Sequence, residues 1–408
     1  MKFSDLNKLK HRPEPAEPAP PKRAAPGPAA ASAAESAAPD RPPQAAAPEE
    51  KLPVVREREK EEPRPAEPAM PRARPAAEVP PGPSFRELRA RAREVYTRML
   101  EQASELLRRI EQPYTEQYDS VIRACKAASA ALKTNPVLLN FTSYSTGTDY
   151  LAAHTANTAI LALAFGRAAG FSDSDLEFLG FCAMAHDIGM TEYKELYNSK
   201  ERLSDEDFSE ITLHTEAGMR MLDRIVDLDY KLKERAKLIL LQTHERLDGS
   251  GYPDRLSGEE IDPLAQIIGI ADVYEAMTHP RPWREALNPP DVVRELIEKE
   301  GRGFSAKTVK ALIAALSIYP PNSLVALSTG EIARVSCVNP GSLTKPVVEV
   351  LLDAEFNRIP PRSVDLLKHP LNSITRTVSP AEIADMNREL ADELRAEYWW
   401  AEEEREEA

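Results

Sequence analysis

Cysteine is scarce in this sequence, with three residues among 408, and none of them forms a CxxC pair. So few and such widely spaced thiols exclude a disulfide framework and a cysteine-rich structural zinc site. Apolar runs are also short, and none approaches the ~20 residues that a helix needs to cross a bilayer. The opening stretch MKFSDLNKLKHRPEP has no apolar segment typical of a signal peptide. We therefore expect a cytoplasmic protein without a transmembrane segment.

An excess of basic charge is missing as well. The chain has 52 Lys and Arg residues against 66 Asp and Glu residues, and its formal net charge is −14. A protein that binds a nucleic-acid polymer needs a basic face to neutralise phosphates. The charge balance therefore disfavours a nucleic-acid polymer as a partner.

Proline is abundant but unevenly distributed. Twenty of the 36 prolines lie within residues 1–83, mixed with Ala, Glu and Arg. A segment of this composition buries too little apolar surface to offset the entropy cost of ordering. We predict a long disordered N-terminal arm over 1–83, which acts as a solvated spacer or, alternatively, as a tether or docking arm.

Helical periodicity begins at Ser84 and continues to the proline pair at 320–321. It predicts an N-terminal helical region over 84–147, followed by a helical domain over 148–320. Within that domain, a stretch led by Ser204 predicts one helix over 205–225. The expected fold class is therefore mostly α.

The last part of the chain changes its period to two. SLVALSTGEIARVSCV and KPVVEVLLD predict three strands of a small β appendage over 321–370. Apolar residues fall on one helix face again from 379, so we expect a C-terminal amphipathic helix over 379–408 with an acidic tip. That apolar stripe could pack on the domain or on a second subunit, and a homodimer is left open.

Histidines and aspartates with apolar neighbours are the main functional signal. The histidines in question lie in or at the ends of predicted helices: His154, His186, His214 and His244. One such histidine is usually a core residue, but four in one helical domain weaken that interpretation. Asp187 follows His186 in LGFCAMAHDIG, and Asp272 follows the apolar run QIIGIA. A carboxylate in apolar surroundings is costly without a compensating cation, and mixed nitrogen and oxygen ligands suit Mn, Fe, Zn, Ni or Co.

The order of these residues resembles the HD superfamily of metal-dependent phosphohydrolases. The additional His214, the segment HERLDGSGYP (244–253) and the segment ADVYEAMTHPRPWR (271–284) resemble its HD-GYP subfamily. The resemblance covers about residues 148–320 and implies an HD-type helical bundle with one or two divalent ions, Fe or Mn being favoured. It also implies hydrolysis of cyclic di-GMP, or a related cyclic dinucleotide, by a metal-bound hydroxide in bacterial second-messenger signalling.

The resemblance assigns roles to the residues at matching positions. The implied ligands of the first ion are His154, His186, Asp187 and Asp272. Asp187 would bridge to a second ion, bound also by His214 and His244, which makes Asp187 the catalytic residue. The implied substrate-binding residues are Gly251, Tyr252, Arg281 and Arg284; arginine guanidinium groups can grip phosphate oxygens in pairs.

Four positions depart from the family pattern. Thr243 replaces the first of two adjacent histidines, which weakens the second ion's site, because a neutral hydroxyl is a poor ligand. Met190 replaces the lysine of the HDxGK motif and cannot contact a phosphate. Glu275 stands where aspartate is usual, and we expect it to be tolerated. Tyr150 stands where three-ion members have a glutamate, so a third ion is not expected.

Three functions remain open at this point. The first is an active phosphodiesterase for cyclic di-GMP or a related dinucleotide. The second is a catalytically impaired module that senses the dinucleotide or a signalling partner such as a diguanylate cyclase. The third is an HD phosphohydrolase for another nucleotide.

Overall fold

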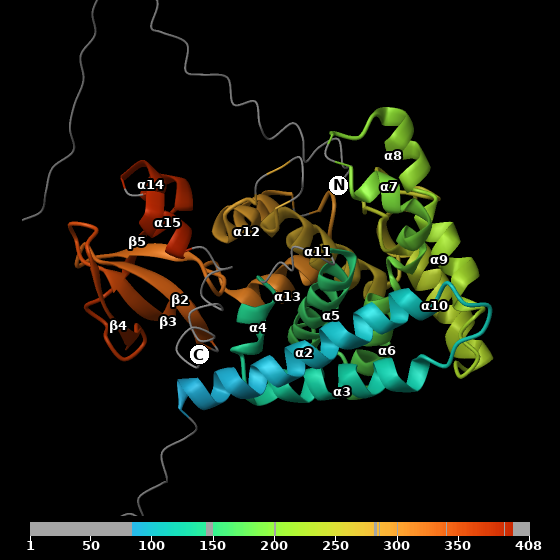
Figure 1. Ribbon diagram of the computed structural model, residues 1–408, viewed down its shortest axis with the longest axis horizontal. Helices are drawn as coiled ribbons and strands as arrows, with labels where there is room; N and C mark the ends of the chain where they lie inside the picture. The colour runs from blue at the N-terminus through green and yellow to red at the C-terminus, as the bar shows by residue number, and fades with distance from the viewer. Residues whose placement is uncertain are drawn as a thin grey trace, which may run out of the picture. The chain divides into compact units, whose positions relative to one another are not determined.

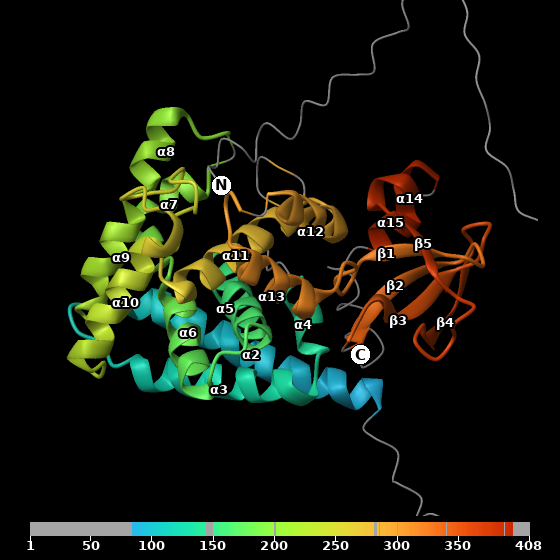
Figure 2. The same cartoon turned by 180° about the vertical axis from the view of Figure 1, so that it is seen from behind.

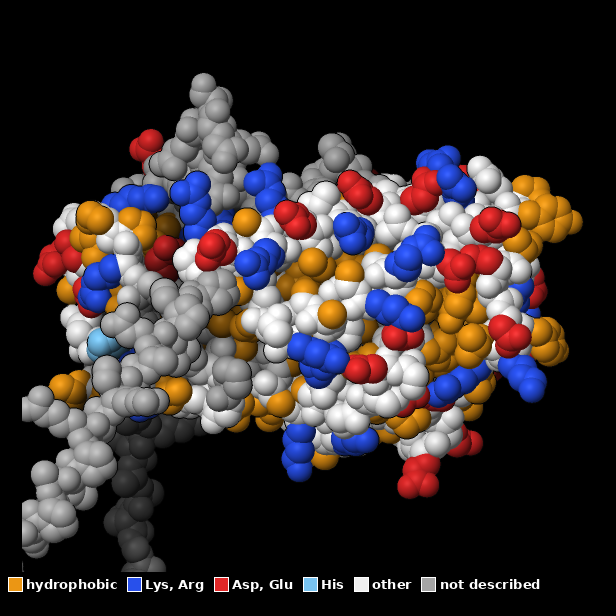
Figure 3. Space-filling model, turned by 90° about the horizontal axis from the view of Figure 1, so that it is seen from below, with side chains coloured by type: hydrophobic (Ala, Val, Ile, Leu, Met, Phe, Trp, Pro, Cys, Tyr) orange, Lys and Arg blue, Asp and Glu red, His pale blue; other side chains and the backbone are white. Residues whose placement is uncertain are grey.

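The computed structural model describes residues 84–143, 150–199, 201–280, 284, 286–299, 301–339, 341–386 and 388–394. The predicted disorder of 1–83, the acidic tip and Arg281 lie outside these residues. The mostly α fold is confirmed, and so is a small sheet near the C-terminus (Figures 1 and 2). None of the described helices is long and apolar enough to cross a membrane. On the face shown in Figure 3, acidic and basic side chains are intermixed.

The N-terminal helical region consists of α2 (Phe85–Arg109), α3 (Tyr118–Thr134) and α4 (Leu138–Phe141). A capping box starts α2: Ser84 Oγ accepts a hydrogen bond from the Glu87 backbone, and the Glu87 carboxylate accepts one from the Ser84 backbone. The buried residues of α2 recur at helical spacing and include Tyr96 and Met99. Helices α2 and α3 run side by side along one edge of the bundle and pack on α5 (Figure 1).

The centre of the bundle is built from helices that are apolar on all sides. In α5 (Tyr150–Ala168) every residue from 151 to 166 is buried. Helix α11 (Pro263–Thr278) is similarly apolar and packs against α5, as does α6 (Asp173–Ala185). A helix without a polar face is stable in water only when it is enclosed by others. The polar side chains on these central helices are therefore buried from the start.

The next part of the chain wraps one end of this core. It comprises η1 (Ile188–Tyr193), α7 (Lys194–Tyr197), α8 (Asp205–Ile211), α9 (His214–Leu222) and α10 (Tyr230–Gln242). The prediction of one helix over 205–225 is wrong, because the chain turns at Thr212 and Leu213 between α8 and α9. The ring nitrogen Nδ1 of His214 lies 2.6 Å from the carbonyl oxygen of Ile211, which the helix break leaves free. The break places His214 at the first position of α9.

The helical domain closes with η2 (Gly258–Glu260), α12 (Pro289–Glu298) and α13 (Ala306–Leu316). An antiparallel sheet follows, with strand order β4-β3-β2-β1-β5. Its strands are β1 (Leu324–Leu327), β2 (Ile332–Asn339), β3 (Ser342–Leu352), β4 (Arg358–Asp365) and β5 (Ile374–Val378). The sheet thus extends beyond the predicted limit at 370. Helices α14 (Pro380–Met386) and α15 (Arg388–Leu394) pack on its apolar residues, among them Leu352 and Val378.

Candidate metal centre

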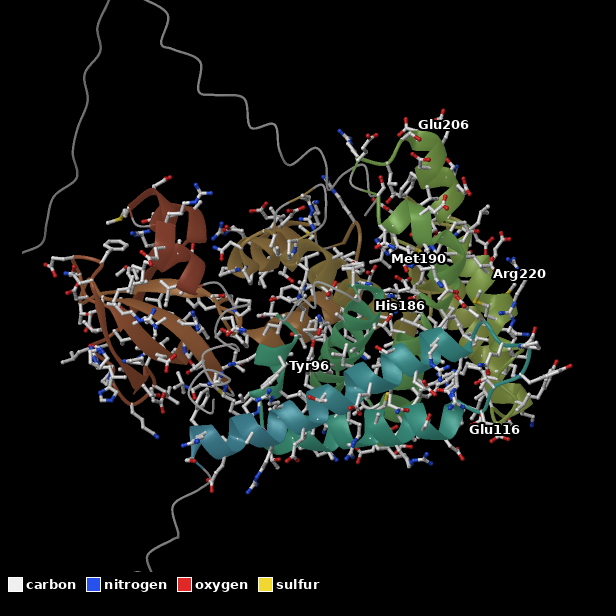
Figure 4. All side chains as sticks on the ribbon, viewed as in Figure 1. Tyr96, Glu116, His186, Met190, Glu206 and Arg220 are labelled. Carbon is white, nitrogen blue, oxygen red and sulfur yellow. The ribbon has the colours of Figure 1, made fainter. Side chains whose placement is uncertain are left out.

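Six side chains from five parts of the helical domain meet at the end of the central helices, where Figure 4 labels His186. They come from α5, the junction of α6 with η1, the start of α9, the residues after α10, and α11: His154, His186, Asp187, His214, His244 and Asp272. All six are shielded from solvent, with at most 13% of any side chain exposed. The structure therefore brings together the whole set of predicted ligands.

Asp187 is the common neighbour of the four histidines. Its Oδ1 lies 3.5 Å from His186 Nε2, 3.3 Å from His214 Nε2 and 3.6 Å from His244 Nε2. Its Oδ2 lies 3.5 Å from His154 Nε2. This position follows from the local fold, because α6 ends at Ala185 and Asp187 stands at the turn into η1.

Asp272 faces the cluster from the opposite helix. Its Oδ1 lies 3.4 Å from His154 Nε2, and its Oδ2 lies 3.5 Å from His244 Nδ1. Burial acts to raise the pKa of both aspartates, but the facing histidines outweigh it. They lower the pKa of Asp272 to about 2 and hold the pKa of Asp187 well below its usual value. Both carboxyl groups are therefore ionised at neutral pH.

Hydrogen bonds behind three of the histidines orient their rings. His186 Nδ1 lies 2.8 Å from the Ala183 carbonyl, and His214 Nδ1 bonds the Ile211 carbonyl in the same way. His154 Nδ1 lies 2.5 Å from the Glu275 carboxylate. A carbonyl oxygen can only accept, so Nδ1 carries the proton in His186 and His214 and Nε2 presents its lone pair to the cluster.

His244 is held differently. Its Nε2 lies 3.1 Å from His214 Nε2, and its ring is stacked on the ring of Tyr252 with centroids 5.0 Å apart. Burial lowers the pKa of His244 to about 4. The imidazole is therefore neutral at physiological pH, which is the form that binds metal ions.

The donor set fits divalent metal ions. Asp187 Oδ1 and His186 Nε2 are buried, and neither has a hydrogen-bond partner among the described residues. Buried polar atoms without partners are costly, and a cation at this point would satisfy both. Two triplets have ligand atoms that all lie within 4.8 Å of one another, and they share Asp187: His154, His186 and Asp187; and Asp187, His214 and His244. Each triplet could hold one ion.

Two glycines allow the backbone to close around the cluster. A Cβ atom on Gly189 would lie 2.0 Å from the carbonyl oxygen of His214, so only glycine lets η1 approach α9 this closely. A Cβ atom on Gly251 would lie 2.4 Å from Glu245 Cα and 2.6 Å from the carbonyl oxygen of His244. Gly251, predicted as a substrate-binding residue, therefore lets the loop pack directly on the backbone beside His244.

Three of the departing residues have clear places. The Thr243 hydroxyl donates to the Ile239 carbonyl at 3.0 Å, within α10's own last turn, and Thr243 is 1% exposed. Met190 is partly buried and packs against the hydrophobic core close to His186 (Figure 4). The Tyr150 ring is stacked on the His154 ring with centroids 5.9 Å apart. The Thr243 hydroxyl is therefore bonded within its own helix, and the residue does not supply the imidazole of the histidine that it replaces.

The predicted substrate-binding side chains have different surroundings. Tyr252 is half-buried, with its ring on His244 and the edge of Phe208 beside it. Arg284 is 8% exposed, and its guanidinium donates to the carbonyls of Ala276 and Met277 at the end of α11. The structure therefore uses Arg284 to cap that helix. A phosphate contact by Arg281 stays a prediction, because this residue lies outside the described part of the chain.

Sequence reasoning missed the residues behind His154. Glu275 was interpreted only as a tolerated change, but its carboxylate is 1% exposed and also accepts a hydrogen bond from the Asn157 amide at 3.2 Å. The signal was available: an acid three residues after Asp272, in a helix that is otherwise apolar. The Tyr96 hydroxyl in turn bonds the Asn157 side chain. Tyr96 carried no comparable signal in the sequence, because a tyrosine on an amphipathic helix is ordinary.

Comparison with known proteins assigns two stretches of the chain to described families. Residues 145–306 match the family described as HD domain, and residues 324–386 match the one described as KOW domain associated with HD domain. This chain carries an HD domain of the HD-GYP subfamily. A cyclic di-GMP phosphodiesterase of Pseudomonas aeruginosa is 31% identical over 242 residues, which are 58% of this chain and 57% of that protein.

Two further relatives match shorter regions. The cyclic di-GMP phosphodiesterase response regulator RpfG of Xanthomonas campestris is 31% identical, over 35% of this chain and 38% of that protein. The 3'3'-cGAMP-specific phosphodiesterase 2 of Vibrio cholerae is 28% identical, over 40% of this chain and 30% of that protein. The HD-GYP chain described here thus spans less than two thirds of the length of each of these relatives.

Proposed function

We propose that this protein is a metal-dependent phosphodiesterase that hydrolyses a cyclic dinucleotide, with cyclic di-GMP as the first candidate. The observation that carries the proposal is the convergence of four histidines on the buried Asp187, whose Oδ1 has no hydrogen-bond partner among the described residues. The relatives support the substrate class, since they are named for cyclic di-GMP or 3'3'-cGAMP. Both molecules share the phosphodiester that such a site attacks.

Each residue of the centre has a proposed task. The first ion would be held by His154, His186, Asp187 and Asp272, and the second by Asp187, His214 and His244. When bound, the ions would activate a water molecule at neutral pH and neutralise charge on the phosphodiester. Fe or Mn suits this mixed set of nitrogen and oxygen ligands best, with Zn, Ni and Co as alternatives.

The chain's own groups prepare the centre for those ions. The Nδ1 bonds of His186 and His214 keep the Nε2 lone pairs directed inward. The ionised aspartates supply negative charge that offsets the charge of the cations. Gly251 seats the loop so that the Tyr252 ring covers His244, and we propose that the exposed part of Tyr252 contacts the substrate beside the ions.

The test is hydrolysis by the full chain loaded with Mn²⁺, or with Fe²⁺ under reducing conditions. Cyclic di-GMP and 3'3'-cGAMP would be incubated separately, and chromatography would look for linear dinucleotides and mononucleotides. Product that requires the ion and disappears in Asp187→Asn supports the proposal. Metal-loaded protein that forms no product from either substrate would rule it out.

One observation favours a second candidate, a module that binds the dinucleotide without turnover. The Thr243 hydroxyl is bonded to the Ile239 carbonyl, so the second triplet lacks a ligand that the family usually supplies. Such a module would bind the cyclic dinucleotide with similar affinity in the wild type and in Asp187→Asn. A panel of other nucleotides in the same assay tests the third function, an HD phosphohydrolase of different specificity. A diguanylate cyclase partner and a homodimer stay predictions.

A further inference from the structure

A buried chain of hydrogen bonds joins helix α2 to the centre. The Tyr96 hydroxyl on α2 donates to Asn157 Oδ1 on α5 at 3.2 Å, and Asn157 Nδ2 donates to Glu275 Oε1 on α11 at 3.2 Å. The other carboxylate oxygen, Glu275 Oε2, lies 2.5 Å from His154 Nδ1. All four residues are at most 3% exposed. This series of hydrogen bonds ends at His154 Nδ1. Asp187 and Asp272 lie at the other side of the same imidazole ring and face His154 Nε2.

Helix α2 stands outside the matched HD domain, which begins at residue 145. Figure 4 labels Tyr96 on this helix and His186 at the metal centre. None of the six proposed metal ligands comes from α2. Tyr96 is connected to the proposed ligand His154 through side chains. It therefore links the N-terminal helical region to the metal centre.

The donor and acceptor of each hydrogen bond fix the orientation of the Asn157 amide. An amide has one accepting and one donating end, so the Tyr96 hydroxyl on Oδ1 turns the Asn157 NH₂ group toward Glu275. Turned the other way, Asn157 would place its oxygen against the carboxylate, which repels it. Glu275, held by Asn157 and lying 3.2 Å from His279 Nδ1, keeps a fixed acceptor behind His154 Nδ1. Partners behind a ligating histidine orient its ring and strengthen its metal bond.

We propose that Tyr96, Asn157 and Glu275 are positioning residues for His154, so that helix α2 sets the affinity of the centre for its metal ion. This inference rests on the metal centre of the proposed function. It assigns α2 a role that packing alone does not require, because a phenylalanine at position 96 would fill the same core. The low local dielectric strengthens each bond, so the loss of one link weakens the next.

The experiment measures Mn²⁺ affinity by titration calorimetry of the full chain, without substrate. Glu275→Gln should bind Mn²⁺ about 10- to 100-fold more weakly, as is usual when a partner behind a ligand is lost. Tyr96→Phe should weaken binding roughly three- to tenfold, the worth of one hydrogen bond. The matched control is Tyr118→Phe, because Tyr118 packs its ring on Phe181 and is not part of the chain. It should leave the affinity unchanged.

A double variant separates a relay from independent effects. Tyr96→Phe combined with Glu275→Gln should bind Mn²⁺ no more weakly than Glu275→Gln alone, since the link is already broken. Additive losses, or a Tyr96→Phe protein that binds like Tyr118→Phe, would overturn the proposal, as would a wild type that binds no ion. A wild type that binds Mn²⁺ but cleaves no dinucleotide would refute the proposed function and leave the relay standing.

Discussion

Asp187 Oδ1 lies 3.3 Å from His214 Nε2, although the two residues belong to separate elements joined by the whole η1–α8 segment. Asp187 stands at the end of α6 and His214 at the start of α9. The cluster therefore depends on how two helix ends meet. A metal ion at this point would join the wrapping helices to the central ones.

Asp187→Asn should remove metal binding without unfolding the protein. The asparagine keeps the shape of the side chain but loses the charge shared by both triplets. In metal-free protein the fold should persist with a lower melting temperature, because the facing histidines that lower the pKa of Asp187 also stabilise its charge in the folded state. The stabilisation that Mn²⁺ gives the wild type should be absent. Mass spectrometry of bound metal and melting curves with and without Mn²⁺ measure this, and an unchanged metal content would contradict it.

Thr243→His should raise the occupancy of the second ion. The present hydroxyl donates to the Ile239 carbonyl, whereas an imidazole would add a nitrogen donor next to His244. The metal-to-protein ratio under limiting Mn²⁺ should increase toward two. Thr243→Ser keeps the hydroxyl bond and is the control. Equal ratios in the two variants would show that position 243 does not face the centre.

Gly189→Ala should separate η1 from α9. The added Cβ would meet the His214 carbonyl oxygen at 2.0 Å, so the backbone must move. We expect the free energy of unfolding to fall by about 1–3 kcal/mol, and binding of the second ion to weaken as His214 shifts. Denaturant titration and metal titration measure the two effects. Gly303→Ala is the matched control, because its Cβ would meet only Arg246 Cδ at 3.8 Å; an equal loss there would refute the explanation.

Arg284→Gln should affect stability more than substrate binding. Its guanidinium satisfies carbonyls at the end of α11, and their loss should cost about 1–3 kcal/mol of unfolding free energy. Burial lowers the pKa of the Arg284 guanidinium, consistent with its enclosed position. The KM for a cyclic dinucleotide should stay within about twofold of the wild-type value. This change is smaller than the loss of one hydrogen bond to the substrate would cause. A large rise in KM with unchanged stability would instead support the phosphate contact predicted from sequence.

The sequence singles out the six proposed ligands because each lies in a conspicuous place. Acids after apolar runs, such as Asp187 and Asp272, violate the burial pattern unless they have a partner. The break before His214 was missed because Thr212 and Leu213 carry no Gly or Pro signal. Strand β4 was missed because RIPPRSVD contains two prolines and lacks alternation. Tyr96 and Asn157 depend on which helices meet, and a pattern along one chain does not contain that information.

The turn between α8 and α9 connects the metal centre to the short helix α8. His214 Nδ1 is bonded to the last residue of α8, a helix of seven residues that begins with the Ser204–Asp207 capping box. Helices this short open locally far more often than a whole domain unfolds. Each opening of α8 removes the acceptor that orients His214, so the residence time of an ion in the second triplet is coupled to this local opening. Amide hydrogen exchange in α8 would then slow when that ion is bound.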